Sequence, residues 1–228
     1  MACGSSVYVS ATQPSSPQRG SVALVVDVDG VVSAVHPVSD VWGDEVTAGH
    51  LFGPVQVSPT LCRRLDALGA LPGVLPMWLT SWPASSRSRM NPFPGREWAA
   101  LVEAEDFADQ GLDEDRIGWW KWDALRAWLQ AHREVRSLVW CDDHLGQLLW
   151  DDTAEGAVDP GGGPRRRPLV AALEPDDAPF LTTAAALIAP RLTQLGVAAT
   201  LLAPEPGVGL RPADLDRMQA ALGQGRQT

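Results

Sequence analysis

The stretch Val22-Ala23-Leu24-Val25-Val26-Asp27-Val28-Asp29-Gly30 decides the fold that we expect for this chain. Its first five residues form a continuous apolar run in which β-branched valine predominates. Such a run predicts a strand that is buried on both faces, as the strands of a parallel sheet are. Two carboxylates and a glycine follow at once, so polar groups stand at the carboxyl end of the predicted strand.

Three further apolar runs with the character of buried strands follow, at 74–79, 138–141 and 197–202. Helical segments separate or follow them, at 58–69, 121–131, 183–195 and 212–222. Ser58 suits the cap of the first helix and Pro59 its first position, and Gly223 is expected to end the last helix. Strands that alternate with helices predict a doubly wound α/β fold, with a mainly parallel sheet and helices on both faces.

Length and composition favour one domain, because the chain has 228 residues, of which 45% are hydrophobic. Residues 1–20 are rich in Ser, Pro, Gln and Gly and are predicted to be disordered. The domain is expected to span 21–223, with a short tail at 224–228. Within it, we expect a loop or flap at 31–57 and irregular structure at 83–118 with a short helix near 97–103. The Gly/Pro/Arg-rich stretch near 153–168 is expected to be a flexible insertion.

Charge and cysteine usage narrow the class of protein. The formal net charge is −10, which argues against unassisted binding to nucleic acid or to an anionic membrane. The three cysteines, Cys3, Cys62 and Cys141, are far apart and form no C-x-x-C pair, so we expect free thiols rather than disulfides or a zinc site. No run of 18 apolar residues and no secretory signal is found, so we expect a cytoplasmic protein.

Polar side chains follow three of the predicted strands. Asp27 and Asp29 follow the first, and two further pairs are Thr80-Ser81 and Asp142-Asp143. Because ligands bind beyond the carboxyl ends of the strands in open parallel sheets, we expect these groups to converge on one site. Clustered carboxylates repel one another unless a cation lies among them, and oxygen ligands favour Mg²⁺ over zinc. His144, beside the acids, is interpreted as an incidental loop residue.

Magnesium usually takes part of its coordination shell from substrate phosphate, so the cluster predicts phosphate chemistry. A carboxylate can attack phosphorus and form an aspartyl-phosphate. At this point the chain resembles the haloacid dehalogenase (HAD) superfamily, whose four motifs are matched in order. The matching stretches are Val25 to Val31 (motif I), Trp78 to Trp82 (motif II), Lys121 within Trp119 to Trp122 (motif III), and Val139 to Asp143 (motif IV).

The resemblance implies a role for each matched residue. Asp27 would be the nucleophile and a metal ligand, and Asp29 the general acid/base, with its main-chain carbonyl on the metal. Thr80 would bind the phosphoryl group, with Ser81 as a minor alternative, and Lys121 would neutralise charge on Asp27 and phosphate. Asp142 and Asp143 would complete the Mg²⁺ shell. We also expect Trp82 to contact the substrate.

The second aspartate of motif I implies a phosphatase rather than a dehalogenase or a pump ATPase. The stretches between the motifs, 31–79 and 83–120, are too short for a large cap domain, so the resemblance implies an open site that suits bulky phosphorylated substrates. We therefore expect a Mg²⁺-dependent phosphohydrolase acting on a phosphate monoester. One alternative is a non-catalytic HAD-like binding module. The other is a nucleic-acid end-processing phosphatase, and the acidic net charge argues against this second alternative.

Lys121 is the single lysine of the chain, which otherwise carries 17 arginines. It stands at the start of a predicted helix, where the helix dipole disfavours a cation by about 0.3–1 kcal/mol. That placement is explained if acids and phosphate lie opposite, so we expect the ammonium to face the carboxyl ends of the strands. On the dipole argument alone, replacing Lys121 by methionine is expected to leave the fold intact.

Overall fold

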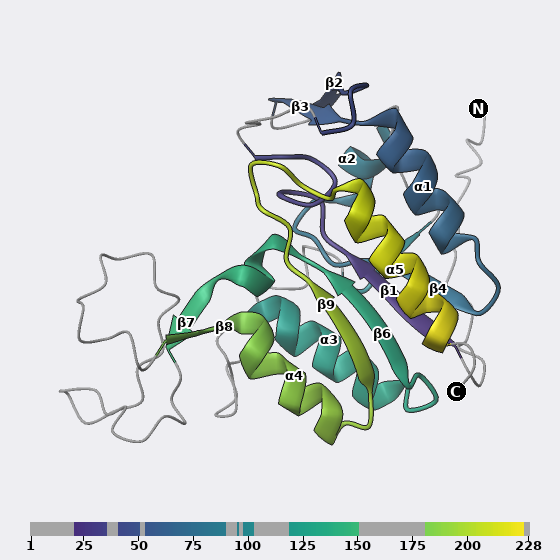
Figure 1. The fold of residues 1–228 in the computed structure, drawn as a ribbon, viewed down its shortest axis with the longest axis vertical. Coiled ribbons are helices and arrows are strands. Elements are labelled where there is room, and N and C mark those ends of the chain that lie inside the picture. Colours follow the sequence, from purple (N-terminus) through teal and green to yellow (C-terminus); the bar gives the residue numbers. More distant parts are fainter. Residues whose placement is uncertain are drawn as a thin grey trace, which may run out of the picture.

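A computed structural model describes residues 21–35, 41–50, 53–89, 95, 98–102, 119–150 and 181–225 (Figure 1). The expectations of a disordered segment at 1–20 and a flexible insertion at 153–168 lie outside the described residues. So does most of 83–118, on which the expected absence of a large cap depends.

The described core is a five-stranded parallel sheet in the order β5-β4-β1-β6-β9. Its strands are β1 (Val22–Val26), β4 (Val74–Trp78), β5 (Ala99–Ala100), β6 (Ser137–Cys141) and β9 (Ala198–Leu202). The first strand in the sequence is therefore the central one, and all five of its residues are buried. The predicted parallel sheet and its four longer strands are confirmed.

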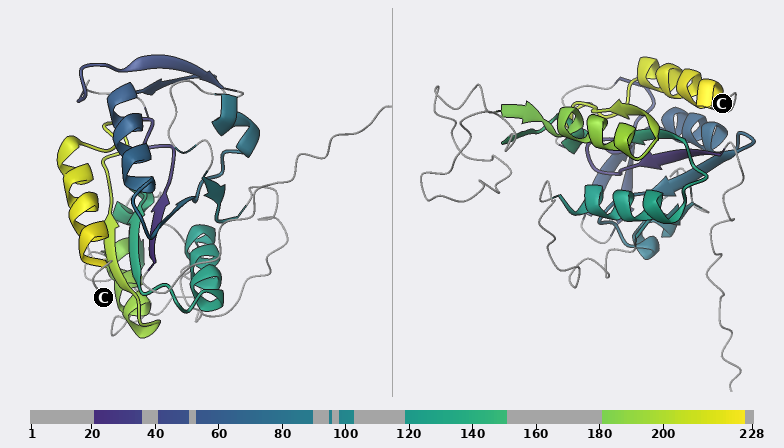
Figure 2. Two further views of the ribbon diagram at one scale, coloured as in Figure 1. Left: turned by 90° about the vertical axis from the view of Figure 1, so that its right-hand side faces the viewer. Right: turned by 90° about the horizontal axis from the view of Figure 1, so that it is seen from below.

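Helices cover both faces of this sheet (Figure 2). On one face, α1 (Pro59–Gly69) and α5 (Pro212–Gly225) contribute buried leucines to a cluster that includes Val22, Leu24 and Val26. On the other face, α3 (Trp120–Ala131) and α4 (Ala184–Gln194) pack against the alternate side chains of β1, Ala23 and Val25. This alternation is what the pleat of a strand dictates, and it confirms the doubly wound α/β architecture.

The predicted start of α1 is confirmed, whereas the predicted end of α5 is wrong. The hydroxyl of Ser58 accepts a hydrogen bond from the Leu61 amide (3.1 Å), and Pro59 opens the helix. In α5 the helix continues through Gly223 to Gly225. A Cβ at Gly225 would lie 2.8 Å from Cβ of Ser137 and 2.9 Å from Val22, so the last turn packs closely against the starts of β1 and β6. That packing outweighs the local preference of glycine to end a helix.

Two further predictions need correction. Residues 31–57, expected as a loop or flap, contain an antiparallel hairpin of β2 (Val46–His50) and β3 (Gly53–Val57). In the region expected as a short helix near 97–103, the described residues form the two-residue strand β5, followed by a bend at 101–102. There Ala99 and Ala100 pair with the end of β4, and the Leu101 amide donates to the Trp78 carbonyl (2.8 Å). An open sheet edge thus outweighs a weak local helical preference.

The remaining elements are short. They are α2 (Ala84–Arg89), the 3₁₀ turn η2 (Asp143–Gly146), and the antiparallel pair β7 (Leu148–Trp150) and β8 (Leu181–Thr183). Cys62 and Cys141 are free, buried thiols, as expected, and burial raises the pKa of Cys62 to about 12. Within the described part of the chain, none of the helices combines the length and apolar character needed to cross a membrane.

Candidate metal and phosphate site

The candidate site lies where successive strands change from one side of β1 to the other. From β1 the chain continues to β4 and β5 on one side, and then returns to β6 on the other side of β1. In doubly wound folds, ligands bind at this switch point, beyond the carboxyl ends of the two strands. Asp27 directly follows β1 and Asp142 directly follows β6. The Asp27 amide still donates to the Cys141 carbonyl (3.0 Å), which holds the two strand ends together.

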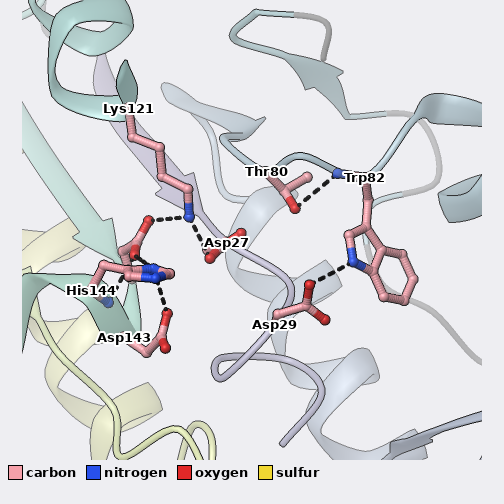
Figure 3. A network of polar contacts seen from close by, with 8 residues as sticks. Asp27, Asp29, Thr80, Trp82, Lys121, Asp143 and His144 are labelled. Carbon is pink, nitrogen blue, oxygen red and sulfur yellow. Dashed lines mark hydrogen bonds and ion pairs between the residues drawn. The ribbon is translucent and has the colours of Figure 1, made fainter. Parts of the chain in front are cut away.

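Lys121 joins the two strand ends through a buried ion triad. Its Nζ lies 2.5 Å from Oδ2 of Asp27 and 2.8 Å from Oδ2 of Asp142 (Figure 3). The side chains of Lys121, Asp27 and Asp142 are 6%, 4% and 0% exposed. The ammonium therefore faces the carboxyl ends of the strands, as its place at the helix start predicted.

The position of this lysine follows from how α3 docks. Trp122, Leu125 and Leu129 are buried against the sheet, which fixes the helix and therefore its first turn. Lys121 is the second residue of α3. Its favourable pairing with two carboxylates outweighs the unfavourable dipole at the helix start, because opposite charges in contact attract far more strongly than a partial charge repels.

The residues after β6 bring a second group of ligand atoms to the same place. Asp142 caps the 3₁₀ turn η2 by accepting a hydrogen bond from the His144 amide (3.0 Å). This turn brings Nδ1 of His144 to 3.1 Å from Oδ1 of Asp143 and 3.4 Å from Oδ1 of Asp142. Our interpretation of His144 as an incidental loop residue therefore needs correction, since its ring contacts the acidic cluster and is 42% exposed.

Four residues could together hold a cation. Asp27, Asp142, Asp143 and His144 each offer one ligand atom, and these atoms lie within 4.8 Å of one another. The buried atoms Oδ1 of Asp143 and Nδ1 of His144 make no hydrogen bond of acceptable geometry, although they approach each other. Three carboxylates converge beside the Lys121 ammonium and the His144 ring, and the cluster stays net negative even when both are charged, so a divalent cation would offset the remaining repulsion. This donor set fits Mg²⁺, which accepts carboxylate oxygens, and the imidazole also suits Mn²⁺ or Zn²⁺.

Burial and charge shift the titration of these groups. Burial raises the pKa of Asp27 to about 7, against the opposing effect of the Lys121 ammonium. Burial lowers the pKa of Lys121, but the carboxylates of Asp27 and Asp142 outweigh it, and the net direction is upward. The nearby carboxylates of Asp142 and then Asp143, 3.4 Å and 3.1 Å from Nδ1, raise the pKa of His144 to about 10. The ammonium thus stays charged at neutral pH, and a further cation beside Asp27 would lower the pKa of that carboxyl group and favour its charged form.

Asp29 lies outside this cluster and has a different partner. Its Oδ2 accepts a hydrogen bond from Nε1 of Trp82 (2.8 Å), and the Trp82 amide donates to Oγ1 of Thr80 (3.3 Å). Figure 3 shows Thr80, Trp82 and Asp29 on the side of Asp27 away from His144 and Asp143. We expected Trp82 to contact a substrate. Its side chain is buried, at 4% exposed, and its polar atom faces Asp29, while a contact with substrate stays a prediction.

The glycine after Asp29 is required by its surroundings. Gly30 has a φ of 69°, in the left-handed region that other residues rarely adopt. A Cβ built on it would lie 2.6 Å from Cγ of Asp143. The loop after β1 and the turn after β6 therefore approach each other closely, with the Asp143 carboxyl group between them.

The predicted site residues thus fall into three groups. Asp27, Lys121, Asp142 and Asp143 come together, Thr80 and Asp29 are linked through Trp82, and Ser81 is exposed to solvent. Comparisons with protein-family models, with curated proteins and with solved structures found no match to this chain. The case for a function therefore rests on the geometry of these groups.

Proposed function

We propose that this protein is a magnesium-dependent phosphohydrolase of the HAD type, which hydrolyses a phosphate monoester through an aspartyl-phosphate on Asp27. The observation that carries this proposal is the buried Asp27–Lys121–Asp142 triad at the switch point of a doubly wound sheet. Burying three charged groups is costly, so a cluster of this kind at a ligand-binding edge favours a functional role over a purely structural one.

The reaction proceeds in two displacements. The Asp27 carboxylate attacks phosphorus, the bond between phosphorus and the leaving oxygen breaks, and Asp29 donates a proton to that oxygen. Water then attacks the phosphorus of the aspartyl-phosphate while Asp29 takes a proton from it, which releases phosphate and regenerates Asp27. The second step restores the protonated carboxyl group of Asp29, so protons balance over the cycle.

The remaining residues hold the phosphoryl group and its charge. The Lys121 ammonium, already 2.5 Å from Asp27, would pair with a phosphoryl oxygen, and the Thr80 hydroxyl would donate a hydrogen bond to another. Asp27, Asp142 and Asp143 would hold Mg²⁺, with His144 at the edge of the same group. When bound, the ion neutralises charge on the phosphate and so favours attack by an anionic nucleophile.

The test combines hydrolysis of p-nitrophenyl phosphate with binding of beryllofluoride, which mimics an acyl-phosphate. We expect turnover that needs Mg²⁺ and stops with chelator, and a rise in the unfolding temperature when Mg²⁺ and beryllofluoride are added together. Asp27→Asn should abolish both effects, because an amide can neither attack phosphorus nor bind beryllium as a carboxylate does.

Asp216→Asn provides a matched control, since Asp216 is 71% exposed on α5 and pairs with Arg64 at the surface. It should retain both activity and stabilisation. Stabilisation by Mg²⁺ with no turnover over small metabolites, phosphopeptides and phosphorylated oligonucleotides would instead support a non-catalytic binding module. Undiminished turnover in excess chelator would contradict the metal assignment.

A further inference from the structure

The contact between Trp82 and Asp29 is not explained by binding a metal or by holding phosphate. The two residues are 53 positions apart, yet Nε1 of Trp82 lies 2.8 Å from Oδ2 of Asp29. Among the described residues, this indole is the hydrogen-bond donor to the Asp29 side chain. We propose that Trp82 is a positioning residue that orients Asp29 for proton transfer to the leaving group. This inference rests on the proposed phosphohydrolase function.

The chemistry of the indole suits this role. An indole nitrogen donates one hydrogen bond and accepts none, so it cannot compete with the substrate for the proton of Asp29. The bond engages Oδ2 and leaves Oδ1 as the oxygen that exchanges a proton with the leaving group or with water. The bond restrains the rotation of the carboxyl group and strengthens as Asp29 gives up its proton, because bonds from a neutral donor to a carboxylate are shorter and stronger than neutral pairs.

Trp82 is itself held at several points, so it can fix the position of another group. Its ring belongs to the buried cluster beneath α1, and its amide donates to Oγ1 of Thr80 (3.3 Å). Its carbonyl accepts a hydrogen bond from the buried side chain of Arg87 in α2. The same residue therefore links the hydroxyl assigned to the phosphoryl group with the carboxyl group assigned to the leaving oxygen. That coupling fixes the distance between the two parts of the site.

A positioning role for Trp82 predicts different effects on two substrates, whereas a purely structural role predicts equal effects. A nitrophenolate leaves without protonation, whereas an alkoxide needs a proton from the general acid as the bond to phosphorus breaks. Loss of the indole N–H should therefore slow benzyl phosphate hydrolysis much more than p-nitrophenyl phosphate hydrolysis. The measured quantity is kcat/KM, which reports the steps up to release of the alcohol and is unaffected by slow hydrolysis of the aspartyl-phosphate.

The first variant is Trp82→Phe, which keeps an aromatic ring and removes the donor. We expect kcat/KM for benzyl phosphate to fall at least about tenfold, a part of the 10²–10⁴ that general acid/base catalysis contributes, while the value for p-nitrophenyl phosphate stays within about threefold. Trp42→Phe is the matched control, since it removes an indole hydrogen bond of similar length, from Nε1 to the Leu210 carbonyl (2.9 Å). Its ratio between the two substrates should equal that of the wild type.

A second replacement at position 82 separates loss of the hydrogen bond from loss of side-chain packing. β-(3-Benzothienyl)-alanine at position 82 keeps the fused ring but has sulfur in place of the N–H, so folding is preserved and the hydrogen bond is lost. It should reproduce the substrate-dependent loss. Independently of turnover, the Nε1 proton of Trp82, identified by its absence from the spectrum of Trp82→Phe, should exchange with solvent faster in Asp29→Ala than in the wild type.

The outcomes separate the two proposals. If the benzothienyl protein has the wild-type ratio of kcat/KM between the two substrates, with or without an equal loss on both, the positioning role is overturned. The phosphohydrolase proposal then still stands. Unchanged exchange of the indole proton in Asp29→Ala also overturns it. A wild-type protein that hydrolyses neither substrate with Mg²⁺ overturns the proposed function, and the inference with it.

Discussion

The ammonium of Lys121 compensates two buried carboxylates, so its removal should destabilise the protein. Replacing one partner of a buried charge group costs about 3–5 kcal/mol, because the remaining charges stay buried and unpaired. Lys121→Met should therefore lower the free energy of unfolding by about this amount without metal. Added Mg²⁺ should raise the unfolding temperature more in the variant than in the wild type, because the ion takes over part of the compensation.

This prediction revises the expectation that the sequence alone supported. That expectation weighed the helix dipole, which disfavours a cation at the helix start, and left out the stabilising effect of the two carboxylates that lie 2.5 Å and 2.8 Å from Nζ. Arg217→Met tests the specificity of the effect, since Arg217 is 63% exposed on α5 and pairs with Asp214 at 3.5 Å. Its loss should cost less than about 1 kcal/mol, as for other loose surface pairs. Equal stability of the two variants in chelator would contradict the compensation by Lys121.

At the same scale, the sequence predicted some site residues and missed others for a physical reason. Asp27, Asp142 and Lys121 were predictable because strand ends and a helix start fix where such residues lie. The contacts of His144 depend on a 3₁₀ turn capped by Asp142, which no period in the sequence indicates. The bond between Trp82 and Asp29 depends on two strands lying side by side, so it becomes visible only in three dimensions.

Among the elements, α1 begins with a cap that has a second function. Ser58 accepts a hydrogen bond from the Leu61 amide, and its hydroxyl donates to Oδ1 of Asp44 (2.5 Å) before the hairpin begins. Hydrogen bonds from Ser58 and then Thr60 hold the pKa of Asp44 below its usual value. The cap therefore ties the helix to the residues that precede β2.

Ser58→Ala should lower the free energy of unfolding by about 1–2 kcal/mol, at the upper end of the range for a lost cap. Thr183→Ala is the matched control, because Thr183 caps α4 through a single bond to the Ala186 amide (3.2 Å). It should cost about 0.5–1 kcal/mol. Urea unfolding of both variants measures the difference, and equal losses would show that the contact with Asp44 adds nothing.

Elements whose own residues show an apolar run, a cap or a helical period were predictable. Elements that form because a neighbouring strand pairs with them were not. Four strands and four helices followed from apolar runs, caps and helical periodicity. The strand β5 has two residues, Ala99 and Ala100, whose extended form depends on the free edge of β4. In the β2–β3 hairpin, glycine and proline interrupt the alternation of apolar and polar residues that would have indicated strands.

For the whole molecule, the buried thiols predict how stability depends on pH. The folded-state pKa of Cys62, about 12, lies above that of an exposed thiol, so the folded protein binds this proton more tightly. Its contribution is complete below the unfolded pKa near 8.5 and is lost as pH rises towards 12. The free energy of unfolding should fall by up to about 1.4 kcal/mol per pH unit for this thiol in that window.

Urea unfolding between pH 8 and pH 10.5 measures this slope. Cys62→Ala should lower stability at pH 8, because it leaves a small cavity, but should show a shallower decline at higher pH. The comparison uses slopes, so the cavity does not affect it. Parallel curves for the variant and the wild type would show that the thiol ionises equally well in both states.

The central position of β1 has a consequence for how the chain is made. A ribosome releases β1 before both of its neighbours, since β4 begins at residue 74 and β6 at residue 137. Until β6 has emerged, the nascent chain carries an apolar strand with an unpaired edge, a species prone to association with other chains. Its covering helix α5 begins later still, at residue 212. Productive folding is therefore favoured when β1 stays apart from other nascent chains until β6 can pair with it.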